Sequence, residues 1–208
     1  LYGIMKHHYK AISATPKIFY KQNDNDNAKG ADAVHIVLTE DGDFQLWLGE
    51  AKFYNSIEDG RFADPLNSVE QMLKTPILRK EIGVMTSLHE LDHQIRDIEL
   101  VERIKKALQG DVSIDDIKPH IHVPILLLHE CNITAGTKRL DDTYKQAIID
   151  YHTERAASFF EKQIKKLENV DNYSCIQFHL ILFPIPKKDE VVDWFLNRAK
   201  ILKEDAEC

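Results

Sequence analysis

Two β-rich runs near the start of the chain constrain its fold most. Residues 31–39 and 44–54 are rich in β-branched and aromatic residues, and the loop Glu40-Asp41-Gly42 between them is typical of a β-hairpin. One face of this hairpin carries Val34, Ile36, Leu38, Phe44, Leu46 and Leu48, and the other carries Val37, Trp47 and Phe53. Because both apolar faces need cover, we expect an α/β sandwich in which helices flank a mixed central sheet.

The rest of the sequence alternates extended and helical patterns, as such a fold requires. Strands are predicted at 16–22, 120–129 and 173–183, and helices at 64–78 (with Pro76 near its end), 87–108, 141–167 (capped by Asp141) and 190–202. A chain of 208 residues without internal repeats predicts one domain, residues 1–208. Residues 1–9 have the spacing of the end of an amphipathic helix, so we expect that a segment precedes Leu1.

The charge of the chain disfavours strong binding to nucleic acid. The sequence has 27 Lys and Arg against 34 Asp and Glu, a formal net charge of −7. Because DNA affinity comes largely from Lys and Arg that neutralise phosphates, we expect weak DNA binding by this chain alone. Short basic clusters occur at Lys138-Arg139, at Lys162 with Lys165-Lys166, and at Lys187-Lys188, where solvated helix faces or loops are the simplest interpretation.

The sequence contains no signal for a membrane or a secreted protein. No apolar run reaches the roughly 20 residues that a membrane-spanning helix needs, and residues 1–10 do not have the order of a secretory signal. Cys131, Cys175 and Cys208 are odd in number and widely spaced, which predicts no disulfide framework. We therefore expect a cytoplasmic protein without a membrane partner.

Three charged residues of the hairpin have the chemistry for metal-dependent phosphodiester hydrolysis. That reaction needs carboxylates to hold a divalent ion, an activated water molecule and a cation to stabilise charge on the phosphate, and Asp32, Glu50 and Lys52 can supply these groups. An acid-x-Lys triplet alone is weak evidence, since Asp116-x-Lys118 is a second one in the same chain.

The register of the hairpin decides whether the three residues meet. Glu50 and Lys52 share a strand face because they are two residues apart. With a two-residue turn at Asp41-Gly42, Asp32 would point away from them, whereas a three-residue loop, Glu40-Asp41-Gly42, places Asp32 opposite Glu50. The Gly at the third loop position favours the three-residue loop.

Opposed residues in such a hairpin have Cβ atoms about 4.5 to 5.5 Å apart, close enough for two carboxylates to share one Mg²⁺. The simpler alternative is a surface acid pair bridged by Lys52 at the end of a sheet.

Gly30-Ala31-Asp32, the hairpin, and Gly49-Glu50-Ala51-Lys52 together resemble the restriction-endonuclease-like PD-(D/E)xK superfamily. More closely, the stretches at 16–20, 30–35 and 46–54 resemble the HamA family, the nuclease subunits of the Hachiman anti-phage system. The resemblance covers most of the chain, although its distinctive motifs lie within residues 16–54.

This resemblance implies a restriction-endonuclease-like fold and a Mg²⁺-dependent (or Mn²⁺-dependent) deoxyribonuclease. It implies that Asp32, Glu50 and the carbonyl of Ala51 bind the metal, and that Lys52 positions or activates water. Some relatives place a Gln on the following helix, where this chain has Gln71; an exposed helix Gln is the simpler interpretation. The resemblance also implies a superfamily 2 helicase partner (HamB) that restrains the nuclease, and DNA as substrate.

Two other functions compete with the nuclease. His89-Glu90-Leu91-Asp92-His93 matches the H-E-x-x-H motif of zinc proteases, but no third ligand follows at an obvious distance. The pairs His120-x-His122 and His129-x-Cys131 could bind a metal, although core packing is the simpler interpretation in so apolar a run. The remaining alternative is a restriction-like fold that serves as an inactive interaction module.

Overall fold

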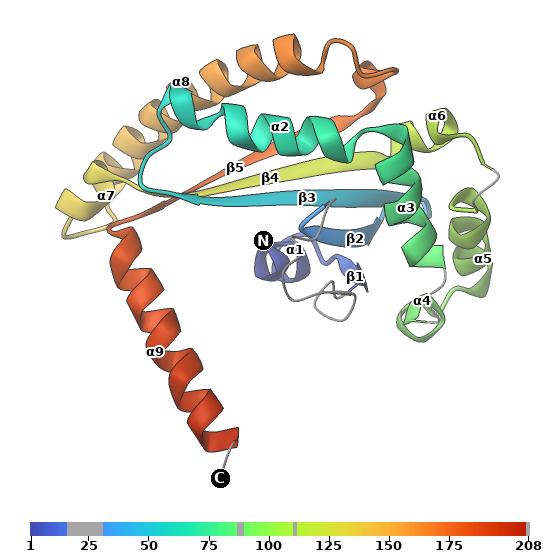
Figure 1. Ribbon diagram of the computed structural model, residues 1–208, viewed down its shortest axis with the longest axis horizontal. Helices are drawn as coiled ribbons and strands as arrows, with labels where there is room; N and C mark the ends of the chain where they lie inside the picture. The colour runs from blue at the N-terminus through green and yellow to red at the C-terminus, as the bar shows by residue number, and fades with distance from the viewer. Residues whose placement is uncertain (16–30, 87–89, 110–111, 207–208) are drawn as a thin grey trace.

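The computed structural model describes residues 1–15, 31–86, 90–109 and 112–206 (Figure 1). The elements in chain order are α1 (Tyr2–His7), β1 (Ile12–Thr15), β2 (Ala33–Leu38), β3 (Phe44–Tyr54), η2 (Asp59–Arg61), α2 (Ala63–Met72), α3 (Thr75–Thr86), α4 (Glu90–Gln94), α5 (Ile98–Ala107), α6 (Ile114–Ile117), η3 (Lys118–His120), β4 (Ile121–Glu130), α7 (Asn132–Gly136), α8 (Asp142–Leu167), η4 (Tyr173–Cys175), β5 (Gln177–Ile185) and α9 (Lys188–Ala206).

A five-stranded mixed sheet with the order β1-β2-β3-β4-β5 forms the centre of the described part. β1, β2 and β3 pair antiparallel, whereas β3, β4 and β5 run parallel. The parallel strands need crossover connections, and α2 and α8 lie in these connections above the sheet in Figure 1. The expected α/β sandwich with a mixed sheet flanked by helices is therefore confirmed.

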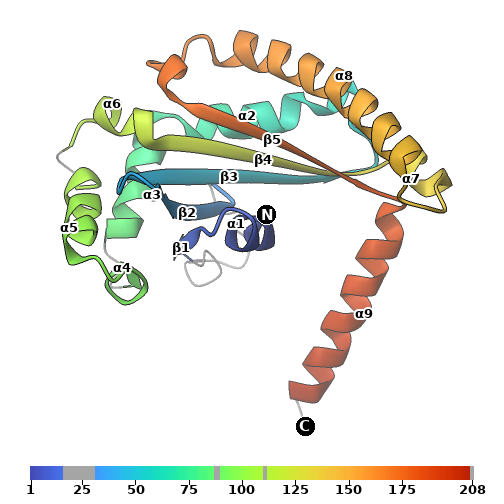
Figure 2. The ribbon, with the colours of Figure 1, turned by 180° about the vertical axis from the view of Figure 1, so that it is seen from behind.

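Helices cover the two faces of the sheet unequally. The main core lies between the sheet and the layer of α2, α3 and α8, where the rings of Phe62 and Phe159 meet edge to face with centroids 5.2 Å apart. On the opposite face, Met5 of α1 packs with Ala11 and Trp47 in a smaller cluster. α9 projects away from the body in both ribbon views (Figures 1 and 2).

The hairpin between β2 and β3 closes with the three-residue loop expected from the sequence. The amide of Thr39 donates to the carbonyl of Asp43 over 2.9 Å, and the amide of Gly42 donates to the carbonyl of Thr39 over 3.1 Å. Gly42 has a φ of 78°, a conformation that residues with a side chain rarely adopt. The loop therefore fixes the register in which Leu38 pairs with Phe44 and Ala33 pairs with Gly49.

Two predicted helices are each divided in the structure. The helix expected at 64–78 ends at Met72, and α3 begins at Thr75 with Pro76 in its first turn. Pro suits the first turn of a helix, whereas in a helix interior its ring would clash with the carbonyl of Met72. The helix expected at 87–108 is interrupted after Gln94, because the side chain of Asp97 caps α5 by accepting a hydrogen bond from Leu100 N.

The other predicted elements are confirmed with shifted ends. α8 begins after Asp141, whose side chain caps it as expected, and β4 differs from the predicted 120–129 by one residue at each end. β5 starts at Gln177 because residues 173–175 form η4, and it extends through Pro184, which an edge strand tolerates. The strand predicted at 16–22 lies outside the described residues. No helix within the described ranges is long and apolar enough to cross a lipid bilayer.

Replacement of Gly42 by Ala tests the importance of the loop conformation. Gly42→Ala is expected to lower the free energy of unfolding by about 1 kcal/mol, because a Cβ is strained at a φ of 78°. Gly60→Ala is the matched control, since a Cβ at Gly60 meets no atom within 4 Å among the described residues. Urea denaturation of both variants measures the difference, and equal effects would contradict the role assigned to Gly42.

Candidate active site

The end of the β2–β3 hairpin brings Asp32 beside Glu50. The register pairs Ala33 with Gly49, so that Asp32 and Glu50 are the next residues in line. The amide of Asp32 donates to the carbonyl of Gly49 over 2.7 Å, and Oδ2 of Asp32 accepts a hydrogen bond from the amide of Ala51 over 2.9 Å. Asp32 therefore holds the residues on both sides of Glu50, while its own side chain is exposed to solvent.

Glu50 is the buried acid of this group. Only 3% of the residue is exposed, and its Oε1 lies 2.7 Å from Nζ of Lys52. Among the described residues no well-directed hydrogen bond reaches Oε1, and the hydroxyl of Ser68 is in hydrogen-bond contact with the carboxylate. Burial raises the pKa of Glu50, and Asp32 raises it further, against the opposing effect of Lys52.

Lys52 completes the group, and its side chain is 25% exposed. Burial lowers the pKa of Lys52, but the hydrogen bond and negative charge of Glu50 outweigh this effect, and the net shift is upward. The upward pKa shift favours the neutral form of Glu50 but the charged form of Lys52, because Glu50 is deeply buried whereas Lys52 reaches the surface. Lys52 therefore stays protonated at neutral pH, with the charges of Glu50, Asp64 and Asp32 around it.

The helix α2 contributes side chains that the sequence analysis did not identify. The hydroxyl of Tyr54 donates to Oδ2 of Asp64 over 2.7 Å, and this pair joins the end of β3 to the first turn of α2. Ser68, one turn further along α2, contacts Glu50. Asp64 and Ser68 have i, i+4 spacing, which places them on one side of the helix. In the sequence, this i, i+4 spacing was the signal that could have pointed to Asp64 and Ser68, although it is equally typical of a solvated helix face.

Ala51 and Gln71, the two other residues predicted for the site, lie in different surroundings. In a β-strand the amide and carbonyl of one residue point to the same edge, so the carbonyl of Ala51 lies on the edge where Asp32 bonds its amide. Gln71 is exposed on α2, seven residues after Asp64 and three after Ser68, and so lies on their side of the helix. The structure therefore brings Asp32, Glu50, Ala51 and Lys52 together and leaves Gln71 in solvent nearby.

The donors present fit a single Mg²⁺ that keeps part of its water shell. Mg²⁺ is commonly held by one or two carboxylates together with water or substrate phosphate. Glu50 offers a buried carboxylate oxygen without a well-directed hydrogen bond, and Asp32 offers an exposed carboxylate beside it. Within the described ranges no group of three or more His, Cys, Asp or Glu could hold a metal, so the protein would supply two carboxylates and the Ala51 carbonyl.

The histidines of the two pairs noted in the sequence, His120-x-His122 and His129-x-Cys131, bond residues outside their pairs. Nδ1 of His120 lies 3.1 Å from the carbonyl oxygen of Phe44, and Cys131 is buried. Nδ1 of His129 donates to the carbonyl of Glu130 over 2.8 Å, so its Nε2 accepts from Nε2 of His152 at 3.1 Å. Nδ1 of His122 lies 2.8 Å from Nε2 of His179, and both rings stack on the indole of Trp47. These contacts agree with the simpler interpretation, core packing.

The zinc-protease motif gains no support from the structure. His89 lies outside the described residues, and α4 covers only five residues, Glu90–Gln94. Asp92 is bound to Nζ of Lys105 at 2.6 Å, and His93 is exposed. The part of the motif that the structure describes is a short surface helix.

The basic clusters are mostly paired with acids or carbonyl groups. Lys162 bonds Asp59, Lys165 bonds Glu161, Lys166 bonds Glu70, and Lys188 bonds the carbonyl of Phe53. The three lysines paired with acids offer less positive charge to DNA phosphates. The pattern agrees with the weak DNA binding expected from the charge.

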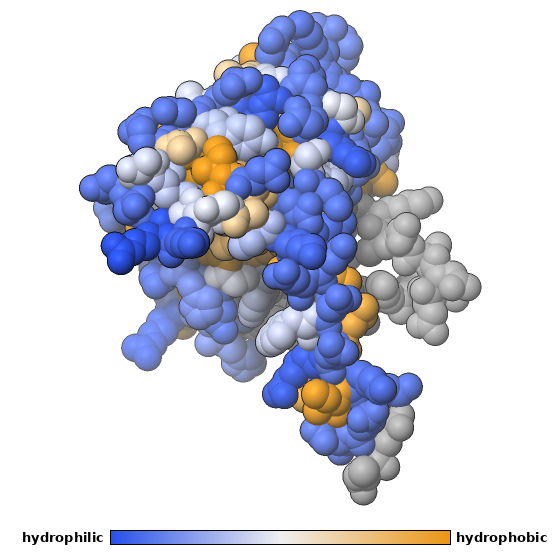
Figure 3. Space-filling view, turned by 90° about the vertical axis from the view of Figure 1, so that its left-hand side faces the viewer, coloured by the Kyte–Doolittle hydropathy of each residue, from blue (hydrophilic) through white to orange (hydrophobic). Residues whose placement is uncertain are grey.

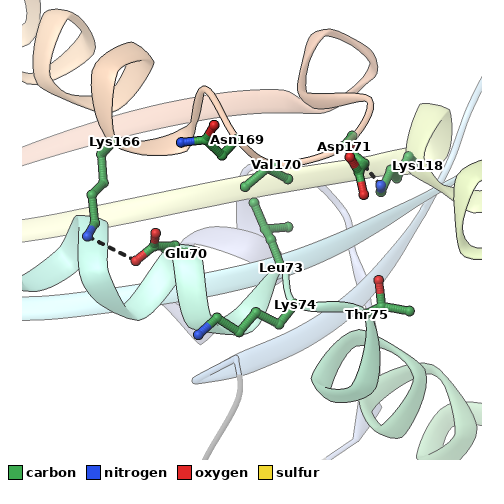
Figure 4. A pocket seen from close by; sticks show the side chains of 9 residues that line it. All are labelled: Glu70, Leu73, Lys74, Thr75, Lys118, Lys166, Asn169, Val170 and Asp171. Carbon is green, nitrogen blue, oxygen red and sulfur yellow. Dashed lines mark hydrogen bonds and ion pairs between the residues drawn. The ribbon is translucent and has the colours of Figure 1, made fainter.

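A pocket of about 170 Å³ lies at the C-terminal end of α2, beyond the hairpin residues (Figure 4). Lys166 pairs with Glu70 on one side of it, and Lys74 reaches along another side (Figure 4). On the far side, the buried Lys118 bonds Asp115 and the carbonyl of Asp171. Lys118 of the second acid-x-Lys triplet therefore takes part in packing through Asp115 and Asp171, while Asp116 is exposed.

The fold and this group define an α/β sandwich protein with two carboxylates and a lysine at the open end of a central hairpin. The chain belongs to the HamA family, whose model matches residues 1–199. This membership makes it a component of the Hachiman antiviral defence system. A search of curated proteins and a search of solved structures give no match.

The burial of Glu50 predicts a variant that is more stable than the wild type. Glu50→Gln is expected to raise the free energy of unfolding at neutral pH by roughly 1 kcal/mol, because it removes a buried charge while Lys52 can still reach solvent. Thermal and urea denaturation without divalent ions measure this effect. Glu70→Gln is the control, since Glu70 is half-buried in a surface ion pair. A destabilised Glu50→Gln would show that the pair with Lys52 outweighs the burial.

The buried histidines predict a loss of stability in mild acid. Burial lowers the pKa of His152 to about 4, from 6.5, and His129 adds to this shift. Since the unfolded chain binds the proton first, stability falls as the pH drops from about 6.5 towards 4. His152→Gln keeps a donor for His129 and should reduce the loss between pH 7 and pH 5 by on the order of 1 kcal/mol.

Urea denaturation at the two pH values measures this difference. His93→Gln, which changes an exposed ring, is the control. An unchanged pH dependence in His152→Gln would contradict the interpretation.

Proposed function

We propose that this chain is a Mg²⁺-dependent deoxyribonuclease (Mn²⁺ being an alternative ion) whose centre is Asp32, Glu50 and Lys52. The observation that carries the proposal is the convergence of these residues through the three-residue hairpin loop. A buried carboxylate, an exposed carboxylate and a lysine at the end of a strand suit metal-assisted attack on a phosphodiester. Membership of a defence family agrees with nucleic acid as the target.

Each residue of the centre has a distinct role in this proposal. Glu50, held from α2 by Ser68, and Asp32, held by the amide of Ala51, would bind the metal together with the Ala51 carbonyl. The bound metal supplies a Lewis acid and an activated water molecule. Lys52, kept protonated beside Glu50, orients the water and stabilises negative charge on the phosphate. A protonated Lys52 favours this positioning role over that of a general base.

A partner in the same defence system would supply the DNA grip that this chain lacks. The formal net charge is −7, and several of the clustered lysines are already paired. We infer that a superfamily 2 helicase, HamB in this family, delivers DNA and restrains cleavage in the cytoplasm. In that arrangement, weak intrinsic DNA binding keeps the nuclease inactive without its partner.

Plasmid digestion tests the proposed activity. In the presence of the helicase, wild-type protein is expected to cleave DNA with Mg²⁺ and not with EDTA, and Lys52→Ala and Glu50→Gln should each lower the rate by at least about a hundredfold. The matched controls are Lys165→Ala and Glu70→Gln, which change surface ion pairs. The assay is run with and without the helicase, so that low affinity for DNA is not mistaken for a missing centre. Full activity of Lys52→Ala would refute the proposed chemistry.

A further inference from the structure

The two edges of the sheet differ in how they are protected from pairing with another chain. The edge strand β1 has only four residues, and its pairing with β2 is irregular between Ser13 and Thr15. β5, at the other edge, pairs with β4 over nine consecutive residues without a bulge. Short strands and bulges are common means by which proteins keep an edge from pairing with another strand. β1 has both of these features, whereas β5 has neither.

β5 also lacks the charges that normally protect an exposed edge. Its sequence, QFHLILFPI, contains no Lys, Arg, Asp or Glu, and burial lowers the pKa of His179, so that this ring is uncharged at neutral pH. None of residues 177–184 is buried, and Phe183 is 47% exposed. In Figure 2, β5 crosses in front of β4 with no labelled element across it. The edge of β5 is therefore long, regular, apolar and open.

One contact shows which main-chain groups of β5 point outward. The carbonyl of Ile185 accepts a hydrogen bond from the amide of Cys131, directly after β4, over 2.9 Å, so the main-chain groups of Ile185 point towards β4. These groups alternate between the two edges along a regular strand, so those of Phe178, Leu180 and Leu182 point away from β4. Within the described ranges, no hydrogen bond from another element reaches these outward amides and carbonyls.

The outward groups are complementary to a second copy of the same strand. In an antiparallel pair centred on Leu180, this residue lies opposite Leu180 of the other copy, and Phe178 lies opposite Leu182. Each such pair of residues exchanges two main-chain hydrogen bonds, which leaves no outward group from 178 to 182 unpaired. A pair centred on Ile181 would instead set Phe178 opposite Pro184, which has no amide to donate.

The side chains of this register also match. Its cross-strand pairs are Phe178 with Leu182 and Leu180 with Leu180 on the face below α8, and His179 with Ile181 and Gln177 with Phe183 on the opposite face. Apolar and aromatic pairs across antiparallel strands stabilise a sheet, whereas like charges placed opposite each other destabilise it. No cross-strand pair here contains two charged residues.

The helix above β5 continues the same uncharged surface. Lys166 bonds Glu70 and so marks the side of α8 that faces α2. At about 100° per residue, Ile149, Phe160 and Ile164 lie roughly 100 to 160° around α8 from Lys166, on the side away from α2. Ile149 is 47% exposed and Ile164 57%. A two-fold axis perpendicular to the sheet keeps both α8 helices on one face of the joined sheet, with these apolar flanks towards each other.

α9 does not obstruct the middle of this edge. The amide of Lys188, the first residue of α9, donates to Oε1 of Glu130 over 2.6 Å. From there the helix leads away from the sheet on the side opposite α2 and α8 (Figures 1 and 2). Apolar side chains are exposed on α9 as well, among them Trp194 at 68% (Figure 3). Because α9 starts beyond the end of β5, these side chains take no part in the strand pair.

We propose that β5 pairs antiparallel with β5 of a second copy of this chain, and that the two sheets join into one continuous sheet around a two-fold axis at Leu180. A second copy fits this edge because the outward amides are symmetric about Leu180 and no charge opposes a like charge. The inference is independent of the proposed nuclease activity, since no residue of the hairpin centre takes part.

Sedimentation of the full chain over a wide range of concentrations tests the dimer. Wild-type protein is expected to dimerise, and Leu182→Pro should weaken dimerisation by at least about a hundredfold, because each copy loses an interchain hydrogen bond and sets a proline ring against the other strand. The pairing of β5 with β4 is retained, since the amide of Leu182 points outward.

Leu182→Ala is the matched control for this experiment. It removes the same side chain but keeps the amide, so it is expected to dimerise within about tenfold of the wild type. Far-UV circular dichroism verifies that both variants fold. A wild-type chain that stays monomeric at every concentration overturns the proposal, even if Leu182→Pro then weakens binding of another protein.

Disulfide trapping tests the register without the proline variant. In a background with Cys175→Ser and Cys208→Ser, Leu180→Cys chains are expected to cross-link with themselves on mild oxidation, because position 180 lies on the two-fold axis with Cα atoms about 5.5 Å apart. Leu182→Cys is the control, since position 182 lies opposite position 178 and far from its own copy. Cross-linking of neither variant, or of Leu182→Cys as readily as Leu180→Cys, would refute the pairing.

Discussion

The loop that closes the β2–β3 hairpin is the constraint on which the candidate site depends. A three-residue loop with Gly42 in the left-handed region sets Ala33 opposite Gly49 and thereby brings Asp32 to Glu50. A loop shorter by one residue would turn Asp32 to the opposite face, because side chains alternate along a strand. The position of one glycine thus determines whether two carboxylates can share a metal.

The burial of Glu50 explains why a cation beside it would stabilise the folded chain. Glu50 is buried below α2 with one carboxylate oxygen lacking a well-directed hydrogen bond, and burial raises its pKa. A buried charge of this kind destabilises the folded chain unless a positive charge compensates it. Lys52 provides part of that compensation, and a divalent ion would provide more. Such a conflict between stability and a buried acid is common at functional sites.

Local rules predicted much of this structure from the sequence. The loop at Glu40-Asp41-Gly42 and the cap at Asp141 each depend on neighbouring residues, so the hairpin, its register and the start of α8 could be derived. Pro76 was ambiguous, because proline both begins and interrupts helices.

Other features depend on tertiary contacts. Ser68 and Asp64 look like a solvated helix face until α2 packs on β3 and brings them to Glu50 and Tyr54. The apolar spacing of residues 190–202 predicted a helix, and only the structure shows that α9 leaves the sheet (Figure 1). The family match supports the assignment to the Hachiman system, whereas the proposed metal site depends on the geometry of the hairpin.

The most direct test of the proposed metal site is an anomalous difference map from crystals grown with Mn²⁺. A metal held by the hairpin predicts a strong peak between the carboxylates of Asp32 and Glu50, with the carbonyl of Ala51 in its coordination shell, and loss of this peak in Glu50→Gln crystals. Absence of a peak at saturating Mn²⁺, or a peak that persists in Glu50→Gln, would contradict the central claim.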